Sequence, residues 1–358
     1  MAHTRSPMRR IDFDITMPSS TYSVLIGERL EDFSAALLSA VRGRKALILC
    51  DSGSANAGLE TVQSILNGGC IEYAVHTLEG GEKAKNLASL ESVLYALIEG
   101  RFSRNDLIIN FGGGVVGDLG GFAAAIFMRG IGYINIPTTL LSMIDSSIGG
   151  KTGIDYFGIK NMLGAFHQPR LVVCASNLIR SLPEREKLSG FGEVLKYYCL
   201  SASPSIENAI EYRRIDPELI GECCTIKLCY VSEDIADHGK RRLLNLGHTF
   251  GHAFEASSGF LLSHGEAVAL GLAAAARFGE RIGVTDSGVA DKIEELISLL
   301  GMSSDFSKYS ASASAFLHHD KKSDSGSIEM AFIKSFGQPL LRRVPIEQAV
   351  RFLSDLRK

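Results

Sequence analysis

Apolar positions in the first half of the chain form short runs that alternate with longer amphipathic segments. Residues 87–100, LASLESVLYALIEG, repeat apolar side chains every three or four positions, which predicts a helix. The short runs are rich in β-branched and aromatic residues, as buried strands are. They cover residues 22–27, 45–51, 71–78, 106–111 and 132–139. Strands that alternate with helices predict a parallel sheet with helices packed on it.

From about Leu182 onward the strand-like runs become rare and helical patterns replace them. The serine-rich stretch that starts at Ser303, SSDFSKYSASASAF, is predicted to be a loop. We therefore predict an α/β domain over residues 1–181, followed by an all-α domain over residues 182–358. The helical patterns of this second domain, several of which end in glycine, cover residues 184–200, 217–235, 247–259 and 264–283.

The composition limits the kinds of partner. Of the 358 residues 46% are hydrophobic, enough for two packed cores, and the formal net charge is −3. Mixed charges without a basic field do not favour binding to nucleic acid or to an anionic membrane, so small molecules are the expected partners. The seven cysteines lack a CxxC spacing, which favours a reduced, cytoplasmic protein. No apolar run is long enough to span a bilayer, and the basic opening segment lacks the core of a signal peptide.

A dense glycine cluster directly follows the strand predicted at residues 106–111. Gly112, Gly114 and Gly117 fit the pattern GxGxxG and precede an alanine-rich helix, the context in which a helix N-terminus holds a pyrophosphate. The alternative is a tight strand-to-helix turn without a ligand. Asp51 ends an earlier strand with no arginine beside it, which suits the ribose of NAD better than that of NADP. Because this acid precedes the glycines, a non-standard sheet order is expected.

Three histidines lie within seventeen residues of one another. His248 and His252 are four residues apart, so a helix presents both on one face, and His264 begins the next predicted helix. Catalytic zinc takes about three nitrogen or oxygen ligands, so two imidazoles and a carboxylate such as Glu193 would suffice. Spacing alone selects His248 and His252 as the paired ligands. Taken singly, such histidines are more often capping or core residues.

Several cations lie beside glycine-rich or apolar segments, where a charge that serves only solubility is unusual. Their best use is to bind an anion that carries phosphate and carboxylate groups. Each of them alone is more often a solvated surface group, and the clusters at residues 149–161 and 227–245 carry the argument. The cations are Lys85, Arg129, Lys151, Lys160, Lys196, Lys227 and Arg241.

Longer motifs occur in a fixed order along the chain. They are IPTTLLSMIDSSIGGKTGID, IKNMLGAFHQP, GEVLKY, NLGHTFGHAFE, HGEAVA and HDKKSDSG. Together with the glycine cluster, these motifs make the chain resemble the 3-dehydroquinate synthases from about Val24 to the C-terminal region. The resemblance implies a Rossmann-like NAD-binding domain, a helical metal-binding domain, an active site in the cleft between them, and a homodimer.

The resemblance also implies site residues, position by position. The zinc ligands would be Glu193, His248 and His264, which assigns His252 to the substrate, and cobalt could satisfy the same ligands. The NAD contacts would be Asp51, Glu82, Lys85, Gly114, Val115, Val116, Gly117, Asp118, Thr138, Thr139, Lys151 and Lys160. The catalytic and substrate-binding residues would be Arg129, Asp145, Lys151, Asn161, Lys196, Lys227, Arg241, Asn245, His252, Lys321 and Lys322.

The family's reaction converts 3-deoxy-arabino-heptulosonate 7-phosphate into 3-dehydroquinate and phosphate, in the shikimate pathway toward aromatic amino acids. NAD would accept and return a hydride within one turnover. The chain departs from the family pattern in DHGKRR before Arg241, in GFGE around Glu193 and in Ile159, and these departures concern loop conformation more than chemistry.

Three alternatives remain open at this point. A related sugar phosphate cyclase, such as an amino-dehydroquinate synthase of secondary metabolism, shares the fold and both cofactors. A metal-dependent alcohol or glycerol dehydrogenase would release NADH instead. A sugar phosphate-binding protein without catalysis is the third. A cyclase of a sugar without a carboxylate would have little use for Arg241, so the sequence favours 3-dehydroquinate synthesis.

Overall fold

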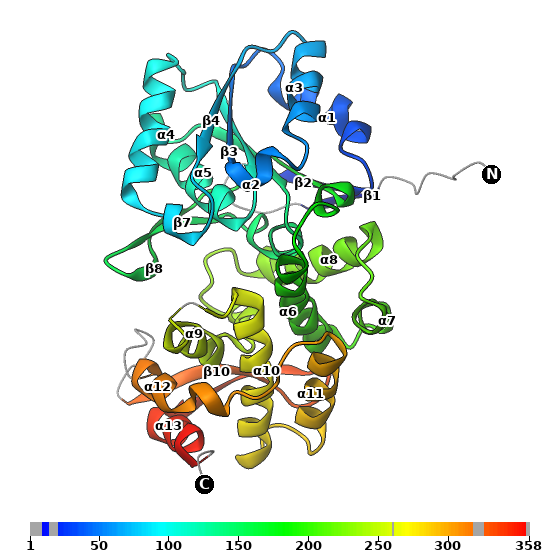
Figure 1. Cartoon of the computed structure of the whole chain (residues 1–358), viewed down its shortest axis with the longest axis vertical. Helices are drawn as coiled ribbons and strands as arrows, with labels where there is room; N and C mark the ends of the chain where they lie inside the picture. The colour runs from blue at the N-terminus through cyan, green and yellow to red at the C-terminus, as the bar shows by residue number, and fades with distance from the viewer. Residues whose placement is uncertain (1–8, 14–20, 260, 318–325, 356–358) are drawn as a thin grey trace, which may run out of the picture. The chain divides into compact units, whose positions relative to one another are not determined.

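The computed structural model of the chain describes residues 9–13, 21–259, 261–317 and 326–355, and it divides into two compact units (Figure 1). The first unit comprises Met1–Pro183 and Ile215–Leu228, and the second comprises Glu184–Arg214 and Cys229–Lys358. The sequence pattern places residues 215–228 in the second domain, whereas in the structure they belong to the first unit. The reason is local bonding, because the Cys224 thiol in this segment donates to the Met143 carbonyl oxygen at 3.4 Å.

The first unit is built on a seven-stranded sheet with the order β1-β2-β9-β6-β5-β3-β4. β1 is antiparallel to β2, and the other neighbours are parallel, which confirms the predicted parallel sheet. β5, which leads into the glycine cluster, pairs with β3, which ends at Asp51, so the order differs from the usual dinucleotide fold. The strands are β1 Arg9–Phe13, β2 Tyr22–Gly27, β3 Ala46–Asp51, β4 Tyr73–Leu78, β5 Leu107–Gly112, β6 Gly132–Pro137 and β9 Leu171–Ala175.

Helices cover this sheet, as Figure 1 shows, with α4 and α5 on one side and α1 and α3 on the other. Leu90 and Val93 of α4 and Leu119 of α5 are buried in one core against β3 and β5. The α-helices are α1 Ser34–Val41, α2 Ser52–Ala55, α3 Leu59–Gly68, α4 Leu87–Glu99 and α5 Gly114–Ile126, followed later by α8 Pro217–Glu233. Shorter elements are the 3-10 helices η1 Leu30–Phe33, η2 Glu82–Ala84, η3 Phe127–Arg129 and η5 Ser176–Ile179, and the π-helix η4 Ser142–Ser146.

The sequence pattern does not predict the antiparallel hairpin of β7 Lys151–Tyr156 and β8 Ile159–Phe166. The positions of β8 are exposed or half-buried, so its sequence lacks the continuous apolar run that marks the central strands.

The second unit is helical, as predicted. α10 is its most buried helix and packs against α6, α9 and α11. The unit also contains an antiparallel pair of strands that the sequence analysis does not predict, β10 Ser327–Ile333 and β11 Pro339–Pro345. In the described part of the chain, no helix has the length and apolarity that crossing a membrane requires. The helices are α6 Glu184–Ser201, α7 Pro204–Tyr212, η6 Lys240–Asn245, α9 His248–Ser257, α10 His264–Arg281, α11 Val289–Leu299, α12 Ser307–Leu317 and α13 Ile346–Asp355.

The loop predicted at the serine-rich stretch is wrong, because α12 occupies most of it. Phe306, Ser310, Ala313 and Leu317 recur every three or four residues and are all buried, and two of them, Ser310 and Ala313, have small side chains. The Ser310 hydroxyl bonds to a carbonyl oxygen one turn earlier, which satisfies it inside the packed face. The helix packs against α9 and α13.

Candidate active site

Three side chains from three helices of the second unit converge. Glu193 lies in the middle of α6, and His248 and His264 are the first residues of α9 and α10. Glu193 Oε1 lies 3.4 Å from His248 Nε2 and 3.1 Å from His264 Nε2. One donor atom of each residue lies within 4.8 Å of the other two, and among the residues that the structure describes this is the one group of that kind.

Both histidines are oriented so that Nε2 faces Glu193. His248 Nδ1 lies 3.1 Å from the Leu246 carbonyl oxygen, and His264 Nδ1 lies 4.0 Å from Glu255 Oε2. A partner on Nδ1 leaves the Nε2 lone pair available to a cation. Two imidazole nitrogens and one carboxylate oxygen are a donor set that catalytic zinc takes, so these residues fit a divalent cation.

The helices that carry the ligands touch through glycine. A Cβ at Gly265, next to His264, would lie 1.7 Å from the carbonyl oxygen of Ser189 on α6. A Cβ at Gly192, next to Glu193, would lie 2.1 Å from the carbonyl oxygen of Gly265. The Gly265 N–H donates to Ser189 Oγ at 3.2 Å. The separation of the two ligands therefore depends on backbone contact between α6 and α10.

The charge of the cluster is set by buried partners. Lys196 Nζ lies 2.5 Å from Glu193 Oε2, and the two side chains are 1% and 0% exposed. Burial opposes ionisation of Glu193, but Lys196 and the histidines outweigh it and hold its pKa well below the usual range. Burial lowers the pKa of His264, but Glu193 and Glu255 outweigh it and raise that pKa to about 9. A bound cation would take the place of this proton, so metal uptake and proton release are coupled.

His252 lies one turn after His248 and is exposed. The centroid of its ring is 5.3 Å from that of His248 and 6.0 Å from that of His264. The pair favoured by spacing, His248 with His252, is therefore not the pair that meets Glu193, because the close partner of Glu193 on the next helix is His264.

Two further predicted residues of the second unit lie in η6. Arg241 is 2% exposed, and its Nη1 donates to the Ile235 carbonyl oxygen at 2.7 Å. Asn245 is the last residue of η6 and is half-buried. Lys321 and Lys322 lie outside the described residues.

In the first unit, the glycine cluster forms the turn between the strand β5 and the helix α5. Gly113 precedes α5, and residues 114–117 form its first turn. A Cβ at Gly113 would lie 3.2 Å from Thr139 Cγ2, and one at residue 114 would lie 3.1 Å from Ser146 Oγ, so larger side chains would crowd the turn. N–H groups of a first helical turn have no partner within the helix, which suits a pyrophosphate. The turn therefore fits a dinucleotide.

Four predicted NAD contacts and one predicted catalytic residue gather beside this turn. Lys85 Nζ donates to Asp118 Oδ2 and to Asn161 Oδ1, both at 2.5 Å. Lys160 Nζ lies 3.6 Å from Glu82 Oε1. Burial lowers the pKa of Lys85, but the carboxylates of Asp118 and Glu82 outweigh it and raise that pKa, so the ammonium group stays charged.

Asp145 lies in the π-helix η4, a type of element that is frequent at functional sites. Lys227 Nζ donates to the Asp145 carbonyl oxygen and to its Oδ1, the latter at 2.9 Å. Asp51 directly precedes α2, and its Oδ1 accepts the Ser54 N–H at 2.6 Å, so one carboxylate oxygen caps the N-terminus of this helix.

The remaining predicted residues of the first unit lie at the ends of elements. Lys151 begins β7 and is exposed, and Arg129 ends η3, also exposed, with a φ of 66°. Thr138 is buried directly after β6, and Thr139 Oγ1 accepts the Ser142 N–H at 3.1 Å.

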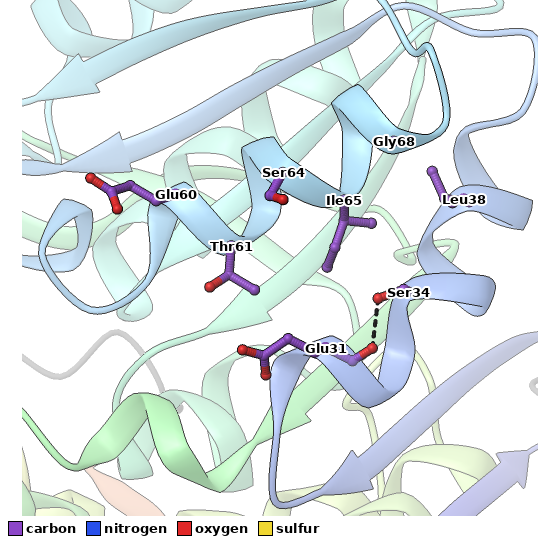
Figure 2. Close-up of a pocket in the computed structure, with 8 residues that line it drawn as sticks. All are labelled: Glu31, Ser34, Leu38, Glu60, Thr61, Ser64, Ile65 and Gly68. Carbon is purple, nitrogen blue, oxygen red and sulfur yellow. Dashed lines mark hydrogen bonds between the residues drawn. The ribbon is translucent and has the colours of Figure 1, made fainter.

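A shallow groove elsewhere in the first unit is shown in Figure 2. Residues of η1, α1 and α3 line it, and the Ser34 hydroxyl donates to the Glu31 carbonyl oxygen at 2.6 Å. No predicted site residue lines this groove. The carboxylates of Glu31 and Glu60 make it unsuited to an anionic substrate.

Sequence reasoning missed two residues that the structure brings into these clusters. Glu255 is 5% exposed and faces His264 Nδ1. It lies seven positions after His248 on α9, so helical spacing could have found it. Asp155 accepts the Asn161 N–H at 2.8 Å, and no local pattern marks this contact across the hairpin turn.

Comparison with known sequences decides the family. A profile of the 3-dehydroquinate synthase N-terminal region matches residues 75–189, and a profile of the C-terminal region matches residues 190–323. A 3-dehydroquinate synthase of Rhodospirillum rubrum is 37% identical over 350 residues, which cover 92% of this chain and 90% of the relative. One of Clostridium beijerinckii is 33% identical over 345 residues, covering 94% and 99%. The chain belongs to the 3-dehydroquinate synthase family.

Solved structures show how widely the fold of this 3-dehydroquinate synthase family member is shared. A 2-deoxy-scyllo-inosose synthase complexed with carbaglucose-6-phosphate, NAD⁺ and Co²⁺ has a TM-score of 0.87 at 23% identity, covering 98% of this chain and 100% of its own. A 2-epi-5-epi-valiolone synthase from Streptomyces hygroscopicus, with NAD⁺ and Zn²⁺ bound, has a TM-score of 0.86 at 24% identity, covering 96% and 98%. An iron-containing alcohol dehydrogenase from Thermotoga maritima has a TM-score of 0.61 at 14% identity, covering 96% and 99%. These likenesses show the fold, and the sequence matches show the family.

Proposed function

We propose that this chain converts 3-deoxy-arabino-heptulosonate 7-phosphate into 3-dehydroquinate and phosphate, using NAD and a divalent cation, zinc or cobalt. The observation that carries the proposal is the convergence of Glu193, His248 and His264 in a chain that matches curated 3-dehydroquinate synthases over most of its length. The dehydrogenase alternative draws on likeness of fold at 14% identity and is not favoured.

Each cofactor has residues that fit it. Glu193, His248 and His264 would hold the cation, which supplies a Lewis acid for an alcohol or ketone oxygen of the substrate. The turn at residues 114–117, with Lys85 beside it, would hold NAD, which supplies reversible hydride transfer.

The chain's own side chains would bind and orient the anionic substrate. Lys196, Lys227 and Arg241 are 1%, 6% and 2% exposed, and cations withdrawn from water interact strongly with phosphate and carboxylate groups. The planar guanidinium of Arg241 suits a carboxylate, and its bond to the Ile235 carbonyl oxygen restricts its orientation. Fixed cations of this kind would hold the substrate in one reactive geometry.

Phosphate release tests the activity. Purified protein with zinc and NAD is incubated with the heptulosonate phosphate, and phosphate, 3-dehydroquinate and NADH are measured together. We expect equal amounts of phosphate and 3-dehydroquinate and no net NADH, with Glu193→Gln as the inactive control. Absence of phosphate release would refute the activity. Stoichiometric NADH would identify a dehydrogenase, and turnover of a sugar phosphate without a carboxylate would identify a related cyclase.

We further propose that the protein is a cytoplasmic homodimer, on the basis of its family resemblance. Sedimentation velocity of the purified protein measures the assembly state. A single species at the mass of one chain, at concentrations used for assay, would overturn the dimer.

A further inference from the structure

Two asparagines interrupt strands that are otherwise apolar. Asn110 lies in β5, LIINFG, and Asn135 in β6, GYINIP, and the two residues are direct partners across the parallel pair. Their exposed fractions are 2% and 4%. A buried amide costs free energy unless it is hydrogen-bonded, so these positions need an explanation beyond hydrophobic packing.

The two amides form a chain of hydrogen bonds. Asn110 Nδ2 donates to Asn135 Oδ1 at 2.9 Å, and Asn135 Nδ2 donates to the Ser147 carbonyl oxygen at 3.0 Å. Asn110 Nδ2 also lies 3.4 Å from the carbonyl oxygen of Gly117, in the first turn of α5. These hydrogen bonds therefore connect the first turn of α5 with Ser147, the residue that follows the π-helix η4.

One glycine of α5, Gly120, makes room for the Asn110 side chain. A Cβ at Gly120 would lie 1.9 Å from Asn110 Oδ1, whereas one at Gly117 would lie 3.9 Å from Asn135 Oδ1. α5 can approach the amides this closely because Gly120 has no side chain. The helix, the two strands and the segment after η4 thus meet at one buried polar contact.

The hydrogen bond from Asn135 to the Ser147 carbonyl oxygen has an effect that apolar packing could not have. The Ser147 N–H donates to the Ser142 carbonyl oxygen at 3.1 Å, which closes the π-helix, and the Ser147 carbonyl oxygen is then available to Asn135. Apolar side chains in the same places would fill the volume without directing this carbonyl group. Asp145 lies two residues before Ser147, so its position depends on the same hydrogen bond from Asn135.

We infer that Asn110 and Asn135 are positioning residues, which fix the segment that carries Asp145 relative to the first turn of α5. The inference rests on the proposed function, in which that segment and that turn contact the substrate and NAD. A misplacement of about 1 Å at such a site costs up to about 100-fold in rate.

The test compares Asn110→Leu, Asn135→Leu and the double variant with the wild type. Each single variant leaves one amide buried without its partner, so its midpoint in urea falls. The double variant recovers part of that loss, because no side-chain amide remains to be paired and only the Ser147 carbonyl oxygen still lacks its donor. In Asn135→Leu and in the double variant, kcat nevertheless stays at least about tenfold below the wild type, and the Kd for NAD rises about tenfold.

Recovery of kcat together with stability in the double variant would overturn the inference, because the pair would then be a purely structural contact. Asn135→Ala serves if the leucine variants do not fold, since it removes the same bonds without adding volume, and it must show the same loss of kcat. If the wild type releases no phosphate, the proposed function fails by itself. NAD affinity, measured by calorimetry, then decides the inference, and an unchanged Kd in Asn135→Leu overturns it.

Discussion

Replacing Gly265 by alanine should separate two of the three candidate metal ligands. The new Cβ would lie 1.7 Å from the Ser189 carbonyl oxygen, whereas such contacts are essentially never shorter than 3.0 Å, so α6 and α10 must part by about 1.3 Å. Neither the new Cβ nor the Ser189 carbonyl oxygen can rotate away, because the carbonyl group is part of the backbone and the Cβ is bonded directly to the backbone. In the wild type Glu193 Oε1 and His264 Nε2 are 3.1 Å apart. Zinc tolerates deviations of only about 0.2 Å in its bond lengths, so the separation of the helices would disturb the site.

We expect Gly265→Ala to weaken zinc binding by about 10- to 100-fold and to lower the free energy of unfolding by about 1–3 kcal/mol. Competition with a chromophoric chelator measures the zinc affinity, and urea unfolding of the metal-free protein measures the stability. Gly68→Ala is the matched control, because it makes the same change at the end of α3, where no atom lies within 4 Å of the new Cβ. Zinc affinity of Gly265→Ala within twofold of the wild type would refute the reasoning.

Three other predictions concern buried or bonded charges. Glu255→Gln should weaken zinc binding by about tenfold or more, measured by the same competition, because the carboxylate faces Nδ1 of His264. Lys85→Met should lower the free energy of unfolding by about 3 kcal/mol, since it leaves Asp118 without its ammonium partner, and adding Asp118→Asn should recover most of this loss in urea unfolding. Burial raises the pKa of Asp234, but three backbone N–H donors outweigh it and lower that pKa below 3.8. The stability difference between the wild type and Asp234→Asn should therefore be complete above about pH 4 and vanish as the pH falls through the lowered pKa, and acid titration of both proteins by circular dichroism checks it.

The central strands were predictable because the sheet buries both of their faces. β3, β5 and β6 are buried at nearly every position, so each of them appears in the sequence as a continuous apolar run. β8 and β11 have half-exposed or exposed positions and leave no such run. α12 escaped prediction because Ser310 and Ala313 occupy the middle of its packed face, and hydropathy does not mark a serine as a core residue.

The candidate site was predictable only where a motif is local. Helical spacing suggests His248 with His252, but contact between α6 and α10 selects Glu193 and His264 instead, and that contact joins segments 71 residues apart. The bond between Lys85 and Asn161 spans 76 residues, and periodicity carries no information over such separations. The family resemblance supplied these residues, and the structure supplies the contacts that hold them.

The chain passes between its two units three times, and the last passage occurs inside the single helix α8, between Leu228 and Cys229. Cutting the polypeptide after Pro183 would consequently not liberate an intact first unit, since the fragment would lack the helical turns that bring Lys227 to Asp145. End-to-end fusion of two independent genes would have left each unit uninterrupted. The interleaved order instead implies that the first unit cannot complete its native contacts until Leu228 has emerged from the ribosome, after the Glu184–Arg214 segment of the second unit.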